Sequence, residues 1–376
     1  MGAGRSNIFG RGQLNSLAID HDQAALNEQT EIVEAFTIGV LDESKMVQWD
    51  EFVFACPDAT FFHRAGWKTI MEKAFGHRTH FLYAENNGKI EGVLPLAQVK
   101  SLLFGHSLCA LPHCVYGGPI AKSNQARRAL DLAAQKLAAD LNVGHLEYRR
   151  FNALHADWPH KDLYVTFRKE IFADHEQNML AIPRKQRAMV RKGIKAELRG
   201  EIDVSVDRFF ALFSDNVHRH GTPALSKRYF QLLKEVFGAD CEILTVVSPD
   251  NKLLSSVLTF YFREEVLPYY AGDDIAGRDC AANDFKYWDL MQRAVERGAR
   301  LFDYGRSKVG TGPYHFKKNW GFEPIPLQYE YQLHRATQVP DQNPLNPKYQ
   351  VFIKAWRAIP LSLANFIGPH IVKYLG

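Results

Sequence analysis

Two similar stretches of sequence decide the fold: GHLEYR at residues 144–149 and GARLFDYGR at residues 298–306. Both have the character of a strand, and each follows a segment with the apolar periodicity of a helix. The helix-like segments span 127–141 and 284–297, and the strand-like segments before them span 80–85 and 90–99 in the first half and 241–247, 253–262 and 266–270 in the second. The same order of strands, helix and strand occurs twice, which predicts a duplicated α+β domain.

The repeat divides the chain into four parts. Residues 1–35 are polar and aperiodic, which predicts a disordered N-terminal segment. Residues 36–165 and 166–335 contain the two copies of the repeated unit, and the second copy includes the motifs described below. Residues 336–376 form a basic amphipathic tail.

The composition is that of an ordinary globular protein. Apolar residues make up 46% of the 376 residues and charged residues 23%, which excludes a mainly disordered chain, a collagen and a coiled coil. The N-terminus lacks the apolar segment of a secretory signal, and no stretch reaches the roughly 18 apolar residues of a membrane span. Five scattered cysteines show no zinc-ligand spacing, so we expect no metal site. We expect a cytoplasmic protein.

A short basic segment stands out from the rest of the chain. The net charge is +4, yet residues 182–200 alone contain seven Lys and Arg side chains and one Glu. On a helix, Arg184, Arg187, Arg191 and Lys195 would share one face. That face is either a solvated surface or a docking surface for phosphate, RNA or an anionic lipid headgroup. We predict that Arg187 and Arg191 bind substrate.

The C-terminal tail is the second unusual segment. After Asp341 the chain contains no Asp or Glu, and residues 351–375 place apolar side chains at helical spacing on both sides of Pro360. A basic amphipathic tail is typical of contact with a membrane surface or with a partner helix. The alternative is a helix that packs back on the body. We expect membrane contact through residues 345–376, with packing as the competing outcome.

The segment around the second repeat contains side chains that could transfer protons or hold a substrate. Asp303 and Tyr304 end a strand at the edge where open α/β sheets place ligands. The Asp303 carboxylate would accept the proton of an incoming ammonium group or orient the acceptor; alternatively, it caps the local backbone or pairs with Arg306. Tyr270 would protonate the leaving group, or the Tyr269–Tyr270 pair simply places one ring in the core. Asp303 and Tyr270 are the predicted catalytic residues.

A cation-rich loop follows this strand. Its glycines permit close approach of the backbone to a phosphate, and an Arg side chain offers two parallel donors. The predicted substrate-binding residues are Arg187, Arg191, Tyr304, Arg306, Ser307, Lys308, Tyr314, His315, Lys317 and Lys318. In the first half, residues 112–119 are rich in glycine and aromatic side chains, and they would line the same cleft or form a tight turn.

Four segments, in this order, resemble FemAB-like proteins: RKQRAMVRKG at 184–193, YYAG at 269–272, DYGRSK at 303–308 and TGPYHFKKNWG at 311–321. The resemblance covers about residues 36–335 and is strongest to the FemAB-like proteins of PEP-CTERM/exosortase systems. It implies two tandem GNAT-type domains with mixed, mostly antiparallel sheets. It also implies transfer of an activated acyl group, since founding members of the family transfer amino acids from aminoacyl-tRNA to peptidoglycan precursors.

The sequence leaves the acyl donor open between aminoacyl-tRNA and acyl-CoA. It contains no long charged heptad insertion like the coiled-coil arm of the founding members. The nearest equivalent of the CoA-binding turn of GNAT domains, residues 277–283, has one glycine. We expect a donor that binds as a substrate and no permanently bound cofactor.

Three functions are compatible with these features. The first is an aminoacyl- or acyltransferase that modifies an amine on an exopolysaccharide or on another polysaccharide or lipid-linked precursor of the cell envelope. The second is an acyl-CoA-dependent N-acyltransferase acting on a small amine. The third is a non-catalytic GNAT pair that tethers envelope-assembly enzymes. The resemblance favours the first, with the protein attached peripherally to the inner face of the cytoplasmic membrane. The sequence predicts no oligomeric state.

Overall fold

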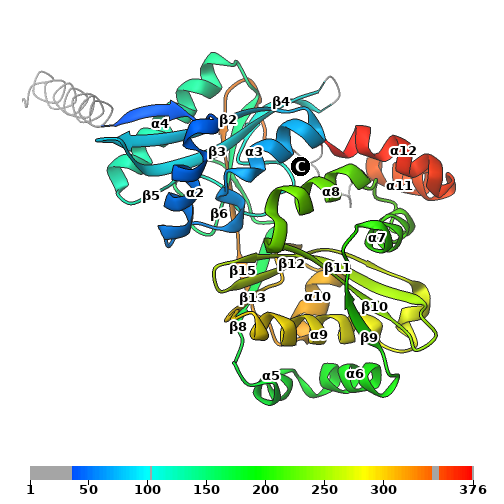
Figure 1. The fold of residues 1–376 in the computed structure, drawn as a ribbon. Coiled ribbons are helices and arrows are strands. Elements are labelled where there is room, and N and C mark those ends of the chain that lie inside the picture. The colour runs from blue at the N-terminus through cyan, green and yellow to red at the C-terminus, as the bar shows by residue number, and fades with distance from the viewer. Residues whose placement is uncertain (1–35, 102–103, 341–346, 375–376) are drawn as a thin grey trace, which may run out of the picture.

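The computed structural model describes residues 36–101, 104–340 and 347–374, so the predicted disorder of residues 1–35 lies outside the described part. Its two halves lie side by side, the first in blue and cyan and the second from green to orange (Figure 1). The first half contains β1 (Thr37–Val40), α2 (Met46–Ala55), α3 (Gly66–Ile70), β2 (Arg78–Asn86), β3 (Lys89–Ser101), β4 (Gly105–Cys109), β5 (Ile120–Ala121), α4 (Asn124–Asp140), β6 (His145–Arg150) and β7 (His160–Lys161).

The rest of the chain builds the second half, one more strand and two C-terminal helices. These elements are β8 (Tyr164–Glu170), α5 (His175–Ala181), α6 (Arg184–Lys195), β9 (Arg199–Ile202), α7 (Asp207–Arg219), α8 (Lys227–Phe237), β10 (Cys241–Val247), β11 (Leu253–Phe262), β12 (Glu265–Asp273), α9 (Ala282–Glu296), β13 (Leu301–Asp303), β14 (Ser307–Lys308), α10 (Gly312–Asn319), β15 (Pro324–Pro326), β16 (Gln328–Leu333), α11 (Pro347–Ala358) and α12 (Leu361–Val372).

Each half contains one mixed sheet. The strand order is β1-β2-β3-β4-β6-β16-β7 in the first sheet, with β5 beside β3, and β14-β8-β13-β12-β11-β10-β9 in the second, with β15 beside β8. Among the described strands, β4 pairs in parallel with β6 and β12 pairs in parallel with β13, while the other pairs are antiparallel. Each parallel pair is connected through the long helix α4 or α9. The structure confirms the prediction of two tandem α+β halves with mostly antiparallel sheets.

Local sequence explains these elements. The hydroxyl oxygen of Ser123 accepts a hydrogen bond from the backbone N–H of Ala126 and caps the first turn of α4. The β2–β3 hairpin turns at Asn87 and Gly88, whose φ angles of 49° and 76° suit an Asn-Gly turn. Strand β11 lies in the middle of its sheet and is buried on both faces, which explains its continuous apolar run.

An aromatic core joins the two halves. The rings of Phe61 and Phe260 stack with centroids 4.3 Å apart, and Phe237 packs against both Phe61 and Trp67. Phe61 and Trp67 come from the first half, whereas Phe237 and Phe260 come from the second. This shared core fixes the relative position of the two sheets and therefore the shape of any cavity between them.

One strand crosses between the halves. The predicted second part, 166–335, includes β16, but β16 pairs with β6 and β7 in the first sheet. Tyr329 and Tyr331 bury their rings there, and the Glu330 carboxylate accepts the backbone N–H of Leu154. Periodicity marks QYEYQL as a strand but does not identify its neighbour, which explains the difference from the predicted boundary.

The C-terminal helices pack on the body, which was the competing outcome for the tail. Helices α11 and α12 lie against α7 at the upper right of Figure 1. Trp356 is 5% exposed, and its carbonyl oxygen lies 3.0 Å from Nε2 of His218. The carbonyl oxygen of Lys373 lies 2.8 Å from Nε2 of His77, in the first half. None of the helices in the described ranges has both the length and the hydropathy of a membrane span.

Candidate active site

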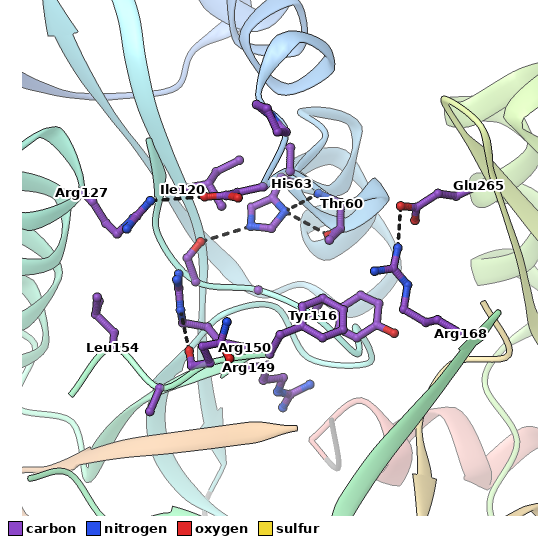
Figure 2. Close-up of a pocket in the computed structure, with 18 residues that line it drawn as sticks. Thr60, His63, Tyr116, Ile120, Arg127, Arg149, Arg150, Leu154, Arg168 and Glu265 are labelled. Atoms are coloured by element: carbon purple, nitrogen blue, oxygen red, sulfur yellow. Dashed lines mark hydrogen bonds and ion pairs between the residues drawn. The ribbon is translucent and has the colours of Figure 1, made fainter. Parts of the chain in front are cut away.

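A cavity of about 470 Å³ opens between the two halves (Figure 2). The first half contributes side chains from α4, β6 and the loops after α2 and β4, and the second half contributes Arg168 of β8 and Glu265 at the start of β12. The charged and aromatic lining residues are Asp58, His63, Tyr116, Arg127, Arg149, Arg150, Phe151, Arg168 and Glu265. A polar cavity of this size at a boundary between two domains is a candidate substrate site.

The charges of this cavity favour an anionic ligand. Four arginines line it against two carboxylates. Arg168 pairs with Glu265 at 2.5 Å, and Arg127 pairs with Asp58 at 3.3 Å. Arg150 donates hydrogen bonds to the backbone carbonyls of Pro119 and Asn152. Arg149 pairs with the buried Glu147 at 2.9 Å. Arg150, whose hydrogen bonds go to backbone carbonyls, therefore offers the guanidinium group that best suits a phosphate or carboxylate group of a substrate.

Part of the stretch 112–119 lines the cavity, although the motif block at 303–318 does not. Tyr116, Gly117 and Gly118 all face it. Gly118 has a φ of 144°, and a Cβ atom there would lie 3.1 Å from Cγ of Arg150. Beside the loop, burial lowers the pKa of His63 to about 4, so its ring is neutral at physiological pH. Glycine thus lets the backbone pass close to the arginines, and His63 adds no charge.

The pair of Arg127 and Asp58 predicts a competition between an internal carboxylate and the substrate. The Asp58 side chain is 63% exposed, so a substrate anion can displace it from Arg127. We expect Arg127→Ala to raise KM for an anionic acceptor by about tenfold or more, as for loss of a hydrogen bond between charged groups. Asp58→Asn should lower KM. Steady-state kinetics test both, with Arg128→Ala, the adjacent position outside the lining, as control. An unchanged KM in Arg127→Ala contradicts direct contact.

Asp303 lies behind the cavity wall and connects the two halves. It is fully buried. Its carboxylate accepts hydrogen bonds from Tyr116 Oη at 2.8 Å and from the Gly305 N–H at 2.7 Å, and Nε of Arg168 lies 3.1 Å from its Oδ2. Burial raises the pKa of Asp303, and the positive charge of Arg168 opposes this shift. The ion-pair partner of Asp303 is Arg168 and not Arg306, whereas the bond from the Gly305 N–H agrees with the alternative of a local backbone cap.

Among the lysines of the predicted substrate-binding residues, Lys317 has the most strongly shifted pKa. It is 9% exposed, and its Nζ donates hydrogen bonds to the carbonyls of Gly305 at 2.9 Å and Arg306 at 3.2 Å. Burial lowers the pKa of Lys317 to about 7, although the negative charge of Asp303 acts in the opposite direction. A neutral amine has two N–H bonds and one lone pair. With both N–H bonds donated to carbonyls, the lone pair is left to accept a proton.

Arg306 belongs to a different, smaller cavity. Its guanidinium stacks on the ring of Tyr164, 4.4 Å from the centroid, and donates a hydrogen bond to Tyr329 Oη at 3.2 Å. Arg149 and Lys161 line the same cavity. Arg149 also borders the larger cavity, so the two cavities lie on either side of its side chain.

The structure does not gather the remaining predicted residues at the large cavity. Tyr270 lies among aromatic rings with its hydroxyl 3.0 Å from that of Tyr229, and burial raises its pKa. Tyr304 and Ser307 are buried in the second half, while Lys308 and Tyr314 are half-buried and His315 and Lys318 are exposed. Arg187 and Arg191 lie on α6, and Arg187 donates hydrogen bonds to the carbonyls of Ile182 and Leu180.

A third cavity, of about 320 Å³, lies at the N-terminus of α9. It borders the single-glycine turn at residues 277–283 and contains both signs of charge: Arg219 and Arg278 against Asp273, Asp274 and Asp284. Met189 of α6 and Phe316 of α10 complete its wall. The predicted basic helix and the predicted motif block therefore meet at this cavity.

Sequence reasoning missed the arginines of the arginine-lined cavity. Arg149 is the last residue of the first repeat, GHLEYR, and Arg150 follows it; their position at the end of a strand was the available signal. Arg127 on a helix and Arg168 on a strand look like ordinary surface cations in the sequence. Only the packing of the two halves brings these four side chains to one cavity.

Comparisons with known proteins agree with this architecture. Residues 184–318 match the model of the acetyltransferase (GNAT) domain. The UDP-N-acetylmuramoylpentapeptide-lysine N(6)-alanyltransferase of Weissella viridescens is 23% identical over 137 residues, which are 36% of this chain and 40% of that protein. The chain thus matches less than half the length of this curated relative.

Two solved structures share the fold over most of the chain. A crystal structure of FemX superposes with a TM-score of 0.62 at 14% identity and covers 84% of this chain and 100% of its own. A tandem GNAT protein from the clavulanic acid biosynthesis pathway gives 0.52 at 12% identity, with 81% and 100% covered. The chain therefore has a tandem GNAT fold and contains a GNAT-type acyltransferase domain. Its two halves are arranged as in FemX.

Proposed function

We propose that the protein transfers an aminoacyl or acyl group to an amine of an exopolysaccharide or another cell-envelope precursor, in the setting of a PEP-CTERM/exosortase system. The observation that supports this most is the connection between the arginine-lined cavity and Lys317. Arg168 and Tyr116 line the cavity and contact Asp303. Gly305 joins Asp303 to Lys317, because its N–H donates to the Asp303 carboxylate and its carbonyl accepts a hydrogen bond from Lys317 Nζ. The alanyltransferase activity of the Weissella relative supports an aminoacyl group and an amine acceptor.

The proposed reaction has simple proton balance. The acceptor arrives as an ammonium ion and loses one proton, its nitrogen attacks the acyl carbonyl, and the bond from that carbon to the donor oxygen or sulfur breaks. The neutral amine of Lys317 accepts this first proton. After the attack the nitrogen loses a second proton, which the leaving oxygen or sulfur takes up as its bond to the carbon breaks. Asp303 is a positioning residue in this proposal, because its carboxylate is already bound to Tyr116, Gly305 and Arg168.

A donor comparison tests the proposed function. Purified protein is titrated calorimetrically with acyl-CoA and with aminoacylated tRNA in parallel, and each donor is then incubated with an amine-bearing envelope precursor. Mass spectrometry should detect the precursor with one added acyl group. Transfer from acyl-CoA to a small amine alone would support the second hypothesis. Binding of neither donor, together with sedimentation on vesicles, would support the tether.

We further propose that the tail attaches the protein peripherally to the membrane. One face of α11 and α12 packs on the body, but Val351 and Phe366 are each 73% exposed and Phe352 and Leu363 are also exposed. Lys354 and Arg357 of α11 are exposed as well, and each Lys or Arg near an anionic bilayer contributes about 1 kcal/mol of binding. The structure thus leaves an apolar, basic face outside the packed one.

Substitutions on the exposed face of the tail distinguish membrane attachment from an effect on folding. We expect Val351→Ser/Phe366→Ser to abolish co-sedimentation with phosphatidylglycerol vesicles while Tm stays unchanged, because neither side chain is buried. The control is Val47→Ser/Val204→Ser, which replaces equally exposed valines elsewhere on the surface. Retained vesicle binding in the tail variant, or no binding by the unmodified protein, contradicts the proposal.

A further inference from the structure

The smaller cavity behind Arg149 contains a guanidinium group that no carboxylate neutralises. We call it the Arg306 cavity; its volume is about 50 Å³, and its lining includes Glu147, Arg149, Lys161, Tyr164, Arg306 and Tyr329. Among the residues that the structure describes, no Asp or Glu forms an ion pair with Arg306. Its side chain donates one hydrogen bond there, from Nη1 to Tyr329 Oη, so Nε and Nη2 remain as donors for a ligand.

The charged groups that line the Arg306 cavity give it an excess of positive charge. Glu147 is the one carboxylate in the described part of the lining, and it pairs with Nε of Arg149 at 2.9 Å. Burial acts to raise the pKa of Glu147, but the positive charge of Arg149 outweighs this and lowers it. Glu147 is therefore ionised and neutralises Arg149. Arg306 and Lys161 bring two further positive charges to the cavity.

The Arg306 guanidinium is held in position by its surroundings. It lies on the ring of Tyr164, 4.4 Å from the centroid. Tyr329 Oη accepts the hydrogen bond from Arg306 and itself donates to the carbonyl of Val115 at 2.7 Å. A guanidinium group fixed in this way loses little freedom when it binds a ligand, and its two remaining donor atoms match two oxygens of an oxyanion.

We propose that the Arg306 cavity binds a single phosphate group, from inorganic phosphate or from a small phosphorylated metabolite, at a site separate from the arginine-lined cavity. A phosphate dianion balances the two charges of Arg306 and Lys161, whereas a carboxylate balances one. A volume of about 50 Å³ is several times the roughly 10–15 Å³ that one water molecule requires. The cavity thus has room for one phosphate group and is too small for a nucleotide.

The Arg306 cavity is connected to Lys317 through the backbone. The carbonyl of Arg306 accepts a hydrogen bond from Lys317 Nζ at 3.2 Å, so a ligand on the Arg306 side chain also steadies this contact. The other groups that face Nζ are the Asp303 carboxylate and the rings of Phe167 and Tyr304. Burial lowers the pKa of Lys317, and the positive charge of Arg306 lowers it further. A bound anion offsets that charge, so phosphate should raise the pKa of Lys317.

Calorimetric titration of the full chain with inorganic phosphate tests the site. We expect Arg306→Gln to weaken the affinity by about tenfold or more, as for lost hydrogen bonds between charged groups. Lys161→Gln should weaken it as well and provides the test if Arg306→Gln does not fold. The matched control is Arg263→Gln, because Arg263 also stacks on a ring, that of Phe262 at 4.6 Å, and lies outside both cavities. It should change the affinity less than about twofold, since a distant exposed charge is screened.

Parallel titrations identify the source of the phosphate group and can overturn the site. Binding of glycerol 1-phosphate that is lost in Arg306→Gln supports a phosphorylated metabolite, whereas its exclusion supports inorganic phosphate. Acetate that binds as tightly as phosphate overturns the choice of phosphate. Phosphate binding that is lost in Arg150→Gln and retained in Arg306→Gln moves the ligand to the arginine-lined cavity and overturns the site. Absence of binding by the unmodified protein also overturns it, while the proposed transfer reaction stands.

Kinetics test the connection to Lys317, and this part rests on the proposed function. With Lys317 as the base, saturating phosphate should raise the pH below which kcat/KM falls, because it raises the pKa of the amine. The residual activity of Arg306→Gln should not respond to phosphate in this way. Calorimetric binding without such a shift retains the phosphate site and refutes its connection to Lys317.

Discussion

Lys317→Met is expected to lower turnover by roughly 10²–10⁴-fold, the usual contribution of a positioned proton acceptor. The methionine retains the length and apolar stem of the side chain and removes the amine, whose pKa of about 7 makes it a base near neutral pH. Steady-state turnover with a saturating donor is the measurement. Lys136→Met is the matched control, because Lys136 is exposed on α4 and pairs with Asp140.

The pH dependence of the unmodified enzyme gives an independent test of Lys317. Since the neutral amine accepts the proton, kcat/KM should fall with a slope of one proton as the pH drops through about 7. This fall at low pH, the acid limb of the profile, should be absent from the residual activity of Lys317→Met. A profile in which activity is highest below pH 7 and falls above it would instead show that the ammonium form is the active one and would falsify the base role.

Asp303→Asn is expected to lower turnover by roughly 10²–10⁴-fold and to destabilise the fold as well, because it removes the charge opposite Arg168 in a buried network. The pH profile separates positioning from mere stability. The negative charge of Asp303 raises the pKa of Lys317, so its removal should move the acid limb of kcat/KM to lower pH. The measurements are the profile and the free energy of unfolding from denaturant titration.

Glu265→Gln is the control for Asp303→Asn. It removes the other carboxylate that pairs with Arg168, yet no contact joins Glu265 to Lys317 among the described residues. It should therefore destabilise the protein with little shift of the acid limb. If both variants lose stability and activity to the same extent and leave the limb in place, Asp303 is only a structural anchor.

The sequence was sufficient to predict the repeated core of the fold. The strands at 241–247 and 253–262 have the predicted bounds, and α9 (Ala282–Glu296) nearly coincides with the predicted helix at 284–297. These elements have strong periodicity because each faces a core on one or both sides. Periodicity did not predict strand β4, because it has only five residues. It also did not predict the neighbour of β16, because β16 pairs with β6, more than 170 residues away along the chain.

The site was less accessible to sequence reasoning than the fold. Asp303 and Lys317 belong to one local block, so their proximity follows from a short strand–loop–helix connection. The partners of Asp303 come from elsewhere: Tyr116 lies 187 residues away, and Arg168 lies on β8. Burial also sets the chemistry, because a lysine in the sequence gives no indication that its amine is desolvated. Such properties arise only when both halves pack together.

The position of β16 has a consequence for synthesis of the chain. The ribosome produces β6 long before β16, with the whole second half in between. At about 5–20 residues per second, that interval lasts on the order of ten seconds. Until β16 emerges, the edge of β6 exposes unpaired backbone groups that attract chaperones or strands of other nascent chains. The half that is translated first is therefore the half that completes its sheet last.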